Sequence, residues 1–94
     1  MPDVVHELLA TEAALDKLGA RDITADEAGQ ILRNEHVTVG NPRGAERVKR
    51  GLLIGRTDGG RVLTLVIERT LEPTTCVIVT GWSATDAERK MLSR

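Results

Sequence analysis

Apolar and branched residues alternate with turn residues through the second half of the 94-residue chain. They form three runs, at residues 50–56, 62–68 and 76–82, in which valine, isoleucine, leucine and threonine are frequent. Branched side chains pack well on a pleated surface, which favours strands in runs of this length. The pattern therefore predicts three strands joined as an antiparallel meander.

The connection between the first two runs reads Thr57-Asp58-Gly59-Gly60. Asp-Gly between apolar runs is a strong hairpin signal, because both residues can take the positive φ values that a two-residue turn requires. The middle strand has apolar residues at both alternating positions, so we expect both faces of the sheet to be at least partly covered. One face would carry Leu63, Leu65 and Ile67, and the other Val62, Thr64 and Val66.

Residues 3–18 have the three- and four-residue apolar spacing of an amphipathic helix. Asp3 is the expected N-cap and Gly19 the expected stop. Thr24-x-x-Glu27 is a capping box, which starts a second helix that runs to about Arg33. We expect Asn34 to end that helix in the left-handed conformation.

Two further elements complete the pattern. Residues 36–40, His-Val-Thr-Val-Gly, alternate as an edge strand does. Ser83-x-x-Asp86 and Thr85-x-x-Glu88 both have capping-box spacing, so a C-terminal helix is expected directly after the last strand. Residues 1–94 are then a single α+β domain with two N-terminal helices, a four-stranded antiparallel sheet and a C-terminal helix.

The net charge of −1 hides an uneven distribution. Residues 1–42 carry eight acidic and three basic side chains (−5), residues 43–69 carry three acidic and seven basic ones (+4), and residues 70–94 carry three of each. The middle of the chain is therefore a candidate surface for anions. An alternative is that the acidic helices simply neutralise the basic sheet.

Most familiar catalytic groups are missing from the sequence. Trp82 is the only aromatic residue, which argues against the base stacking of RRM-like or OB-like domains. Cys76 is the only cysteine, so an internal disulfide is excluded and a cysteine-based zinc site is unsupported. Because no Walker loop, hydrolase triad or carboxylate pair is visible, no metal or cofactor is expected. The absence of a signal segment or long apolar run predicts a cytoplasmic location without membrane contact.

The remaining polar residues suit cleavage of RNA through its own 2′-hydroxyl. Such a reaction needs a base for that hydroxyl, cations for the phosphorane charge and an acid for the leaving oxygen. Arginine forks grip phosphate, Trp82 can stack a base, and Glu88 or His36 can act as the base. The plainer alternative is that the arginines are solvated residues at strand ends.

The order of several short motifs resembles the RelE/ParE toxin superfamily, specifically the BrnT-type ribonuclease toxins and a neighbouring uncharacterised family of the same fold. Lys17-Leu18-Gly19 and the Ile-Thr-Ala-Asp-Glu-Ala stretch at 23–28 are similar to its helix junction. The stretches 54–56 and 59–63 match its sheet, and Ala84-Thr85-x-x-Glu88-Arg89 matches the start of its last helix. Three features differ. The group usually has an arginine where Trp82 stands and a histidine where Leu18 stands, and it opens with an aromatic-rich strand and helix.

The resemblance implies a metal-independent endoribonuclease, acting as the toxin of a type II toxin–antitoxin pair. The residues expected to be catalytic are Arg50, Arg61, Glu88 and Arg89, and those expected to bind RNA are Arg43, Lys49, Arg56 and Trp82. Their guanidinium groups should meet in one open hollow beside the indole. Expected partners are RNA, a cognate antitoxin and a second copy in a homodimer. The presence of Trp82 favours the alternative, a non-catalytic RelE-like module for protein binding or dimerisation.

Overall fold

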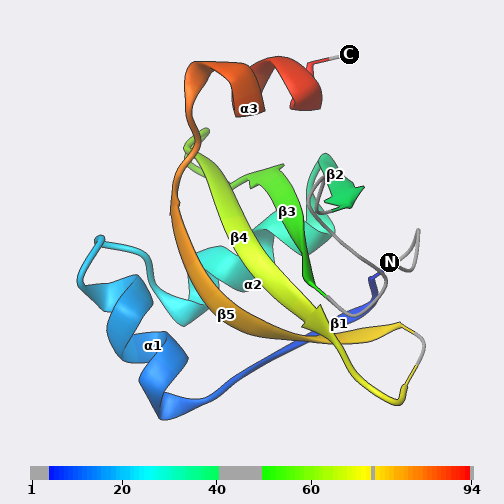
Figure 1. Cartoon of the computed structure of the whole chain (residues 1–94). Helices are drawn as coiled ribbons and strands as arrows, with labels where there is room; N and C mark the ends of the chain where they lie inside the picture. The colour runs from blue at the N-terminus through cyan, green and yellow to red at the C-terminus, as the bar shows by residue number, and fades with distance from the viewer. Residues whose placement is uncertain (1–4, 41–49, 73, 94) are drawn as a thin grey trace.

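Five strands form one sheet in the part of the chain that the computed structural model describes, residues 5–40, 50–72 and 74–93 (Figure 1). The elements are, in order, β1 (Glu7–Ala10), α1 (Glu12–Gly19), α2 (Ala25–Arg33), β2 (His36–Gly40), β3 (Arg50–Arg56), β4 (Val62–Arg69), β5 (Thr75–Ser83) and α3 (Asp86–Leu92). The strand order across the sheet is β1-β5-β4-β3-β2. β1 is parallel to β5 and the other neighbours are antiparallel. The α+β class and the meander are confirmed, but the sheet is five-stranded and mixed, not four-stranded and antiparallel.

The predicted helix over residues 3–18 is wrong in its first half, where β1 forms instead. Leu8 of β1 lies opposite Cys76 of β5, at the edge of the sheet. α1 begins after Thr11, the actual N-cap, whose Oγ1 accepts a hydrogen bond from the N–H of Ala14 (3.1 Å). The predicted cap, Asp3, lies outside the described residues. Residues 7–10 have helical spacing, but the edge of β5 offers their backbone groups partners, and this pairing overrides the local periodicity.

The β3–β4 hairpin is confirmed, but its turn is not the predicted two-residue form. The carbonyl of Thr57 accepts a hydrogen bond from the N–H of Gly60 (3.0 Å), and the N–H of Thr57 donates to the carbonyl of Arg61 (2.8 Å). Gly60 is the one residue of this loop with a positive φ, 88°. A tight turn followed by glycine in the left-handed region makes a three-residue hairpin loop, which needs no positive φ at Asp58.

The two faces of the sheet are covered to different extents. The α1–α2 face packs on both N-terminal helices, and this cluster is the main core; α2 lies behind the sheet in the view of Figure 1. The opposite face, called here the α3 face, is covered by α3 at one end only. The main core includes Leu18, Ile31, Leu53, Leu65 and Ile67, and the smaller cluster includes Ile54, Val62 and Leu92.

The capping boxes predicted at Thr24 and Thr85 are confirmed, whereas Ser83 caps no helix. The predicted end of α2 at Arg33, with Asn34 as its C-cap, is also confirmed, but the left-handed conformation expected of Asn34 is wrong. Thr24 with Glu27 and Thr85 with Glu88 each exchange the two expected hydrogen bonds. Asn34 is extended, with φ of −98°. Its side-chain amide donates to the carbonyl of Arg56 (3.0 Å) and to the carboxylate of Asp58 (2.9 Å), so the residue joins α2 to the hairpin loop instead of ending the helix in the left-handed region.

Candidate functional site

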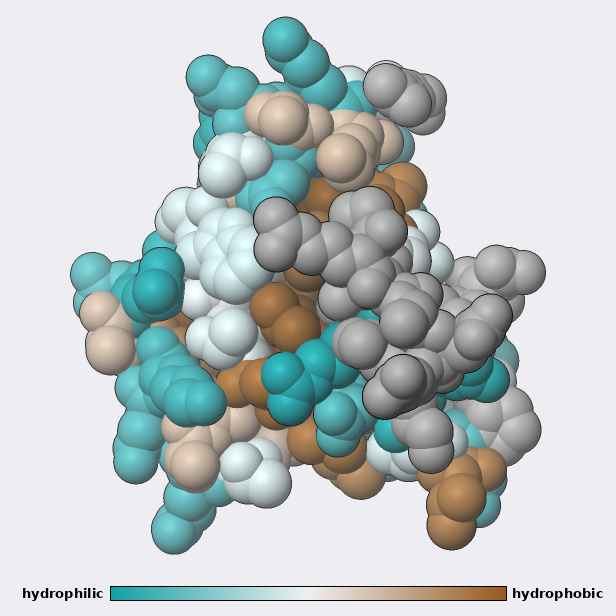
Figure 2. All heavy atoms as spheres, viewed as in Figure 1, coloured by the Kyte–Doolittle hydropathy of each residue, from teal (hydrophilic) through white to brown (hydrophobic). Residues whose placement is uncertain are grey.

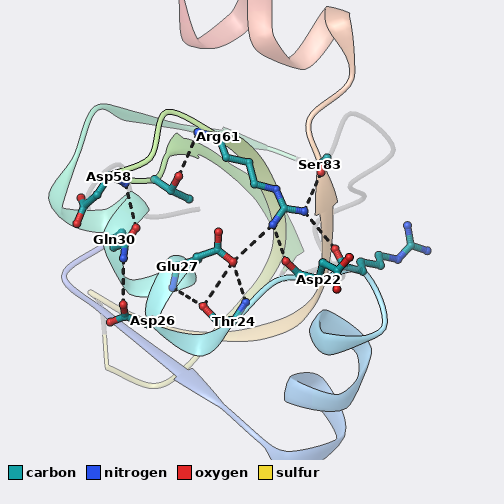
Figure 3. Close-up of polar contacts among 10 residues, drawn as sticks. Asp22, Thr24, Asp26, Glu27, Gln30, Asp58, Arg61 and Ser83 are labelled. Carbon is teal, nitrogen blue, oxygen red and sulfur yellow. Dashed lines mark hydrogen bonds and ion pairs between the residues drawn. The ribbon is translucent and has the colours of Figure 1, made fainter.

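Arg61, a predicted catalytic residue, lies at the start of β4 and reaches toward the connection between α1 and α2 (Figure 3). Its guanidinium donates to the carbonyl oxygens of Asp22 and Arg21, the latter at 3.2 Å. It also donates to the hydroxyl of Ser83 (3.1 Å) and pairs with the carboxylate of Glu27 (3.5 Å). Because these contacts join the sheet to the α1–α2 connection and to α2, Arg61 acts as a clamp between the sheet and the two helices.

The backbone of the α1–α2 connection explains why this clamp is needed. Asp22 has a φ of 58°, a left-handed conformation that is unfavourable for a residue with a side chain. The turn carries its carbonyl oxygens outward, and the five-donor fork of arginine can bond two of them together with a carboxylate. Lysine lacks this planar fork, so a lysine at position 61 could not make the same set of hydrogen bonds.

Arg50 and Arg56 lie on the α3 face, at the two ends of β3. Arg50 pairs with Glu68 (3.1 Å) and Arg56 with Glu35 (3.4 Å), and each of these side chains is at least two-fifths exposed. Six residues of extended chain separate the arginines by about 20 Å. Arg50, Arg56 and Arg61 therefore pair with three different carboxylates and form no common hollow in the described residues.

Glu88 and Trp82 do come together, on the α3 face at the start of α3. The Oε1 atom of Glu88 accepts hydrogen bonds from the indole N–H of Trp82 (3.0 Å), from the hydroxyl of Thr64 (3.0 Å) and from the backbone N–H of Thr85 (2.8 Å). Thr64 is fully buried in the middle of β4, so its hydroxyl needs an internal partner. Glu88 thus joins the last helix to the centre of the sheet.

These hydrogen bonds decide the protonation of Glu88. Burial raises the pKa of its carboxyl, but the hydrogen bonds from Thr85, Trp82 and Thr64 stabilise the carboxylate and together hold the pKa below its usual value. A general base works best when its pKa is near the working pH. Glu88 is therefore a weak base at neutral pH, and its bonds fit a helix cap better than a proton acceptor.

We expect the Glu88→Gln variant to lose about 1 kcal/mol of unfolding free energy at neutral pH, because the charge-assisted hydrogen bonds become neutral ones. The pKa of Glu88 is lower in the folded than in the unfolded protein. The stabilisation by its carboxylate is therefore fully present at pH values above the ordinary glutamate pKa, about 4.5, and is lost as the pH falls through the pKa of the folded protein. The difference between wild type and variant should then shrink as the pH is lowered below the usual pKa of a glutamate. Urea unfolding followed by Trp82 fluorescence measures it, and a difference that stays constant with pH would contradict this account.

His36, the other candidate base, lies on the opposite face of the sheet from Trp82 and Glu88. His36 pairs with Gly55 on the α1–α2 face, and its Nδ1 lies 2.9 Å from the carbonyl oxygen of Asn34. Arg89 is exposed on α3. Arg43 and Lys49 lie outside the described residues.

Sequence reasoning missed the residues that hold the hairpin loop on α2. The N–H of Asp58 donates to the side-chain oxygen of Gln30 (3.0 Å), and the amide of Gln30 donates to Asp26 (3.0 Å) (Figure 3). Only the i, i+4 spacing of Asp26 and Gln30 is a local signal for any of these bonds. Thr64 carried no local signal either, since a threonine in a strand is ordinary.

A strip of half-buried side chains remains on the α3 face beyond α3. It runs across the four neighbouring strands β1, β5, β4 and β3 and is called here the open strip. In the view of Figure 2, apolar atoms reach the surface in the middle of this face, with hydrophilic residues around them. Leu9 at its end is 47% exposed, an unusual fraction for a leucine in a sheet. The strip consists of Leu9, Leu52, Val66, Val77 and Thr80.

Other kinds of site find little support in the described residues. No group of three or more His, Cys, Asp or Glu side chains there is arranged to hold a metal ion. Cys76 is buried, as predicted, and burial raises the pKa of its thiol, which makes it less reactive. None of the helices described has the length and apolar character needed to cross a membrane.

Comparisons with known proteins assign no family. No protein-family model matches the chain, and no curated protein or solved structure matches it significantly. The fold itself defines an α+β protein with a mixed five-stranded sheet in its described residues.

Proposed function

We propose that this chain is a non-catalytic protein-binding module related to the RelE/ParE superfamily, and that it contacts its partner through the open strip. The observation that carries the proposal is the commitment of the expected catalytic groups to the fold. Arg61 bonds the α1–α2 connection, and Glu88 caps α3 and holds Trp82 and Thr64. Each has its hydrogen-bonding capacity directed at its own chain.

Membership of that superfamily is part of the proposal. The order of helix pair, meander and last helix agrees with the motifs that resemble it. The strand β1 ahead of α1 also supports the relationship, because the group opens with a strand and a helix. Here that opening lacks aromatic residues, as the sequence shows.

The open strip suits a protein partner better than a nucleic acid. Its side chains are leucine, valine and threonine, whereas nucleic-acid surfaces are rich in cations and exposed aromatic rings. The ion pair of Arg50 and Glu68 borders it and adds no net charge. The partner is therefore expected to present apolar side chains to the strip.

The second candidate function is an endoribonuclease toxin that is blocked by an antitoxin. One observation favours it: Arg50, Arg56 and Trp82 share the α3 face with Glu88. An RNA strand lying across this face would pass the indole and meet an arginine at either end of β3. In this candidate, Arg61 supports the fold and does not touch the RNA, while Arg89, Arg43 and Lys49 would add positive charge.

The experiment that tests the proposed function uses a matched pair of variants. Val66→Asp places a charge in the open strip, whereas Leu71→Asp places one at a loop residue that is fully exposed. With immobilised protein and an extract of the producing cells, we expect the same partner to be retained by wild type and Leu71→Asp and to be at least about tenfold depleted with Val66→Asp. Equal retention by all three would exclude the strip as the contact surface.

An RNA assay separates the two candidate functions. If the protein is a non-catalytic module, purified protein in excess leaves RNA intact, and cells that express wild type grow as well as cells that express Glu88→Gln. RNA cleavage by wild type that falls in an Arg56→Ala variant would instead establish the ribonuclease, and it would leave the strip as the surface that an antitoxin covers.

A further inference from the structure

The outer edge of β2 has backbone groups that point away from the sheet. The N–H of Arg56 donates to the carbonyl of Glu35 (3.3 Å), which makes these two residues a hydrogen-bonded pair. Along an antiparallel ladder, hydrogen-bonded pairs alternate with pairs that exchange no hydrogen bond. The register has no shift between His36–Gly55 and Gly40–Gly51, so Val37 and Val39 are the residues of β2 that bond β3. The N–H and C=O groups of His36, Thr38 and Gly40 are therefore directed outward, and they bond no described residue.

In the residues that the structure describes, this edge lacks the features that usually prevent strand pairing. Natural edge strands carry charges, prolines or bulges, or they are very short. β2 has five uncharged residues, three of them valine or threonine, and its pairing with β3 has no bulge. The other edge, β1, is shorter and carries the charged residue Glu7.

We propose that a second copy of the chain pairs with β2 in antiparallel fashion, around a two-fold axis at Thr38. Thr38 would then face the partner's Thr38, and His36 would face the partner's Gly40. All outward groups of the five-residue strand are satisfied in this register. A shift by two residues in either direction leaves only residues 36–38 or 38–40 paired, so the centred register is favoured.

The side chains of β2 agree with this register on both faces. On the α3 face, Val37 would contact the partner's Val39. Both valines already pack against the cluster of Ile54, Val62 and Leu92, so pairing would join the two apolar clusters into one. On the other face, the absence of a side chain at Gly40 leaves room for the partner's His36. The net charge of −1 gives two copies little reason to repel each other.

The pairing has a consequence for the open strip. A two-fold axis between antiparallel strands runs perpendicular to the sheet, so both copies would show the α3 face on the same side. The dimer would present two open strips side by side, which allows a two-site partner to bind more tightly than either strip alone. This last step rests on the proposed function, whereas the pairing does not.

Crosslinking tests the register. Thr38→Cys adds a half-buried thiol at the outer edge of the sheet to a protein whose own Cys76 is buried. Facing residues of a hydrogen-bonded pair have Cα atoms about 5.5 Å apart, within the range of a disulfide. With a mild thiol oxidant, we expect Thr38→Cys to form a covalent dimer about tenfold faster, or more, than Leu71→Cys, which has an exposed loop thiol outside the edge. Equal rates would overturn the proposal.

Sedimentation of the untagged protein tests the pairing itself. Thr38→Pro removes an outward N–H and no hydrogen bond of the monomer, so it should yield a folded monomer, while Thr38→Val should remain a dimer. Circular dichroism checks that the proline variant is folded. If it is not, Thr38→Lys takes its place, because two lysines would then face each other across the two-fold axis. Their repulsion should prevent dimerisation at low salt, and the dimer should return at high salt. A wild type that sediments as a monomer at every concentration overturns the dimer and leaves the strip proposal standing. An intact dimer whose Val66→Asp form still holds the partner overturns the strip proposal alone.

Discussion

Replacing Arg61 by alanine should lower the free energy of unfolding by about 2–3 kcal/mol, the largest effect expected of any arginine described here. The guanidinium makes four contacts, to two backbone carbonyls, one hydroxyl and one carboxylate, and its side chain is 31% exposed. Alanine leaves the left-handed turn at Asp22 without its clamp. Thermal unfolding followed by circular dichroism should show a midpoint about 10–20 °C lower.

Two variants control this prediction. Arg50→Ala removes an arginine whose ion pair is about half exposed, 50% and 44% for its two side chains, and should cost less than about 1 kcal/mol. Arg61→Lys keeps the charge but loses the fork, so it should fall between wild type and alanine. If Arg61→Ala were as stable as Arg50→Ala, Arg61 would not be a clamp between the sheet and the two helices.

Gly55→Ala should cost about 1–3 kcal/mol, because the added methyl group meets atoms that have little freedom to move. A Cβ at this position would lie 2.8 Å from the Cβ of Ile31, 3.0 Å from the Cβ of His36 and 3.1 Å from the carbonyl oxygen of Ile31. The close approach of α2 to β3 depends on the missing side chain. Urea unfolding monitored by Trp82 fluorescence measures the loss.

Gly40→Ala is the matched control for that substitution. Gly40 also lies in a strand with an allowed φ, but an added Cβ there meets nothing within 4 Å. The stability of its monomer, measured at a concentration too low for copies to pair, should stay within about 0.5 kcal/mol of wild type. An equal loss in both variants would show that the effect does not come from the packing of α2 on β3.

The sequence predicts a basic stretch in the middle of the chain, but it does not predict which carboxylate pairs with each arginine. The stretch 43–69 was correctly found to be basic, yet Arg50, Arg56 and Arg61 pair with carboxylates of β4, of the α2–β2 connection and of α2 itself. Two of these acidic partners lie more than twenty residues away along the chain. Which carboxylate neutralises which arginine follows from the register of the sheet and the position of α2, and neither leaves a mark on local composition.

Local chemistry accounts for what could be predicted of the elements. The capping boxes at Thr24 and Thr85 need only residues three apart, so their helices begin where the sequence places them. The strands of the meander also agree to within one residue, because alternating branched residues and glycine turns act over a few positions.

Tertiary structure alone decided the first strand, the use of Asn34 and the role of Glu88. Residues 7–10 satisfy a helical pattern but become β1, since the edge of β5 supplies backbone partners that no local pattern can register. Glu88 caps its own helix, as predicted. It also accepts hydrogen bonds from Trp82 and from the buried Thr64, which lies 24 positions earlier in the chain. Short-range bonds can be inferred from neighbouring residues, whereas a bond between distant residues exists only once the sheet has brought them together.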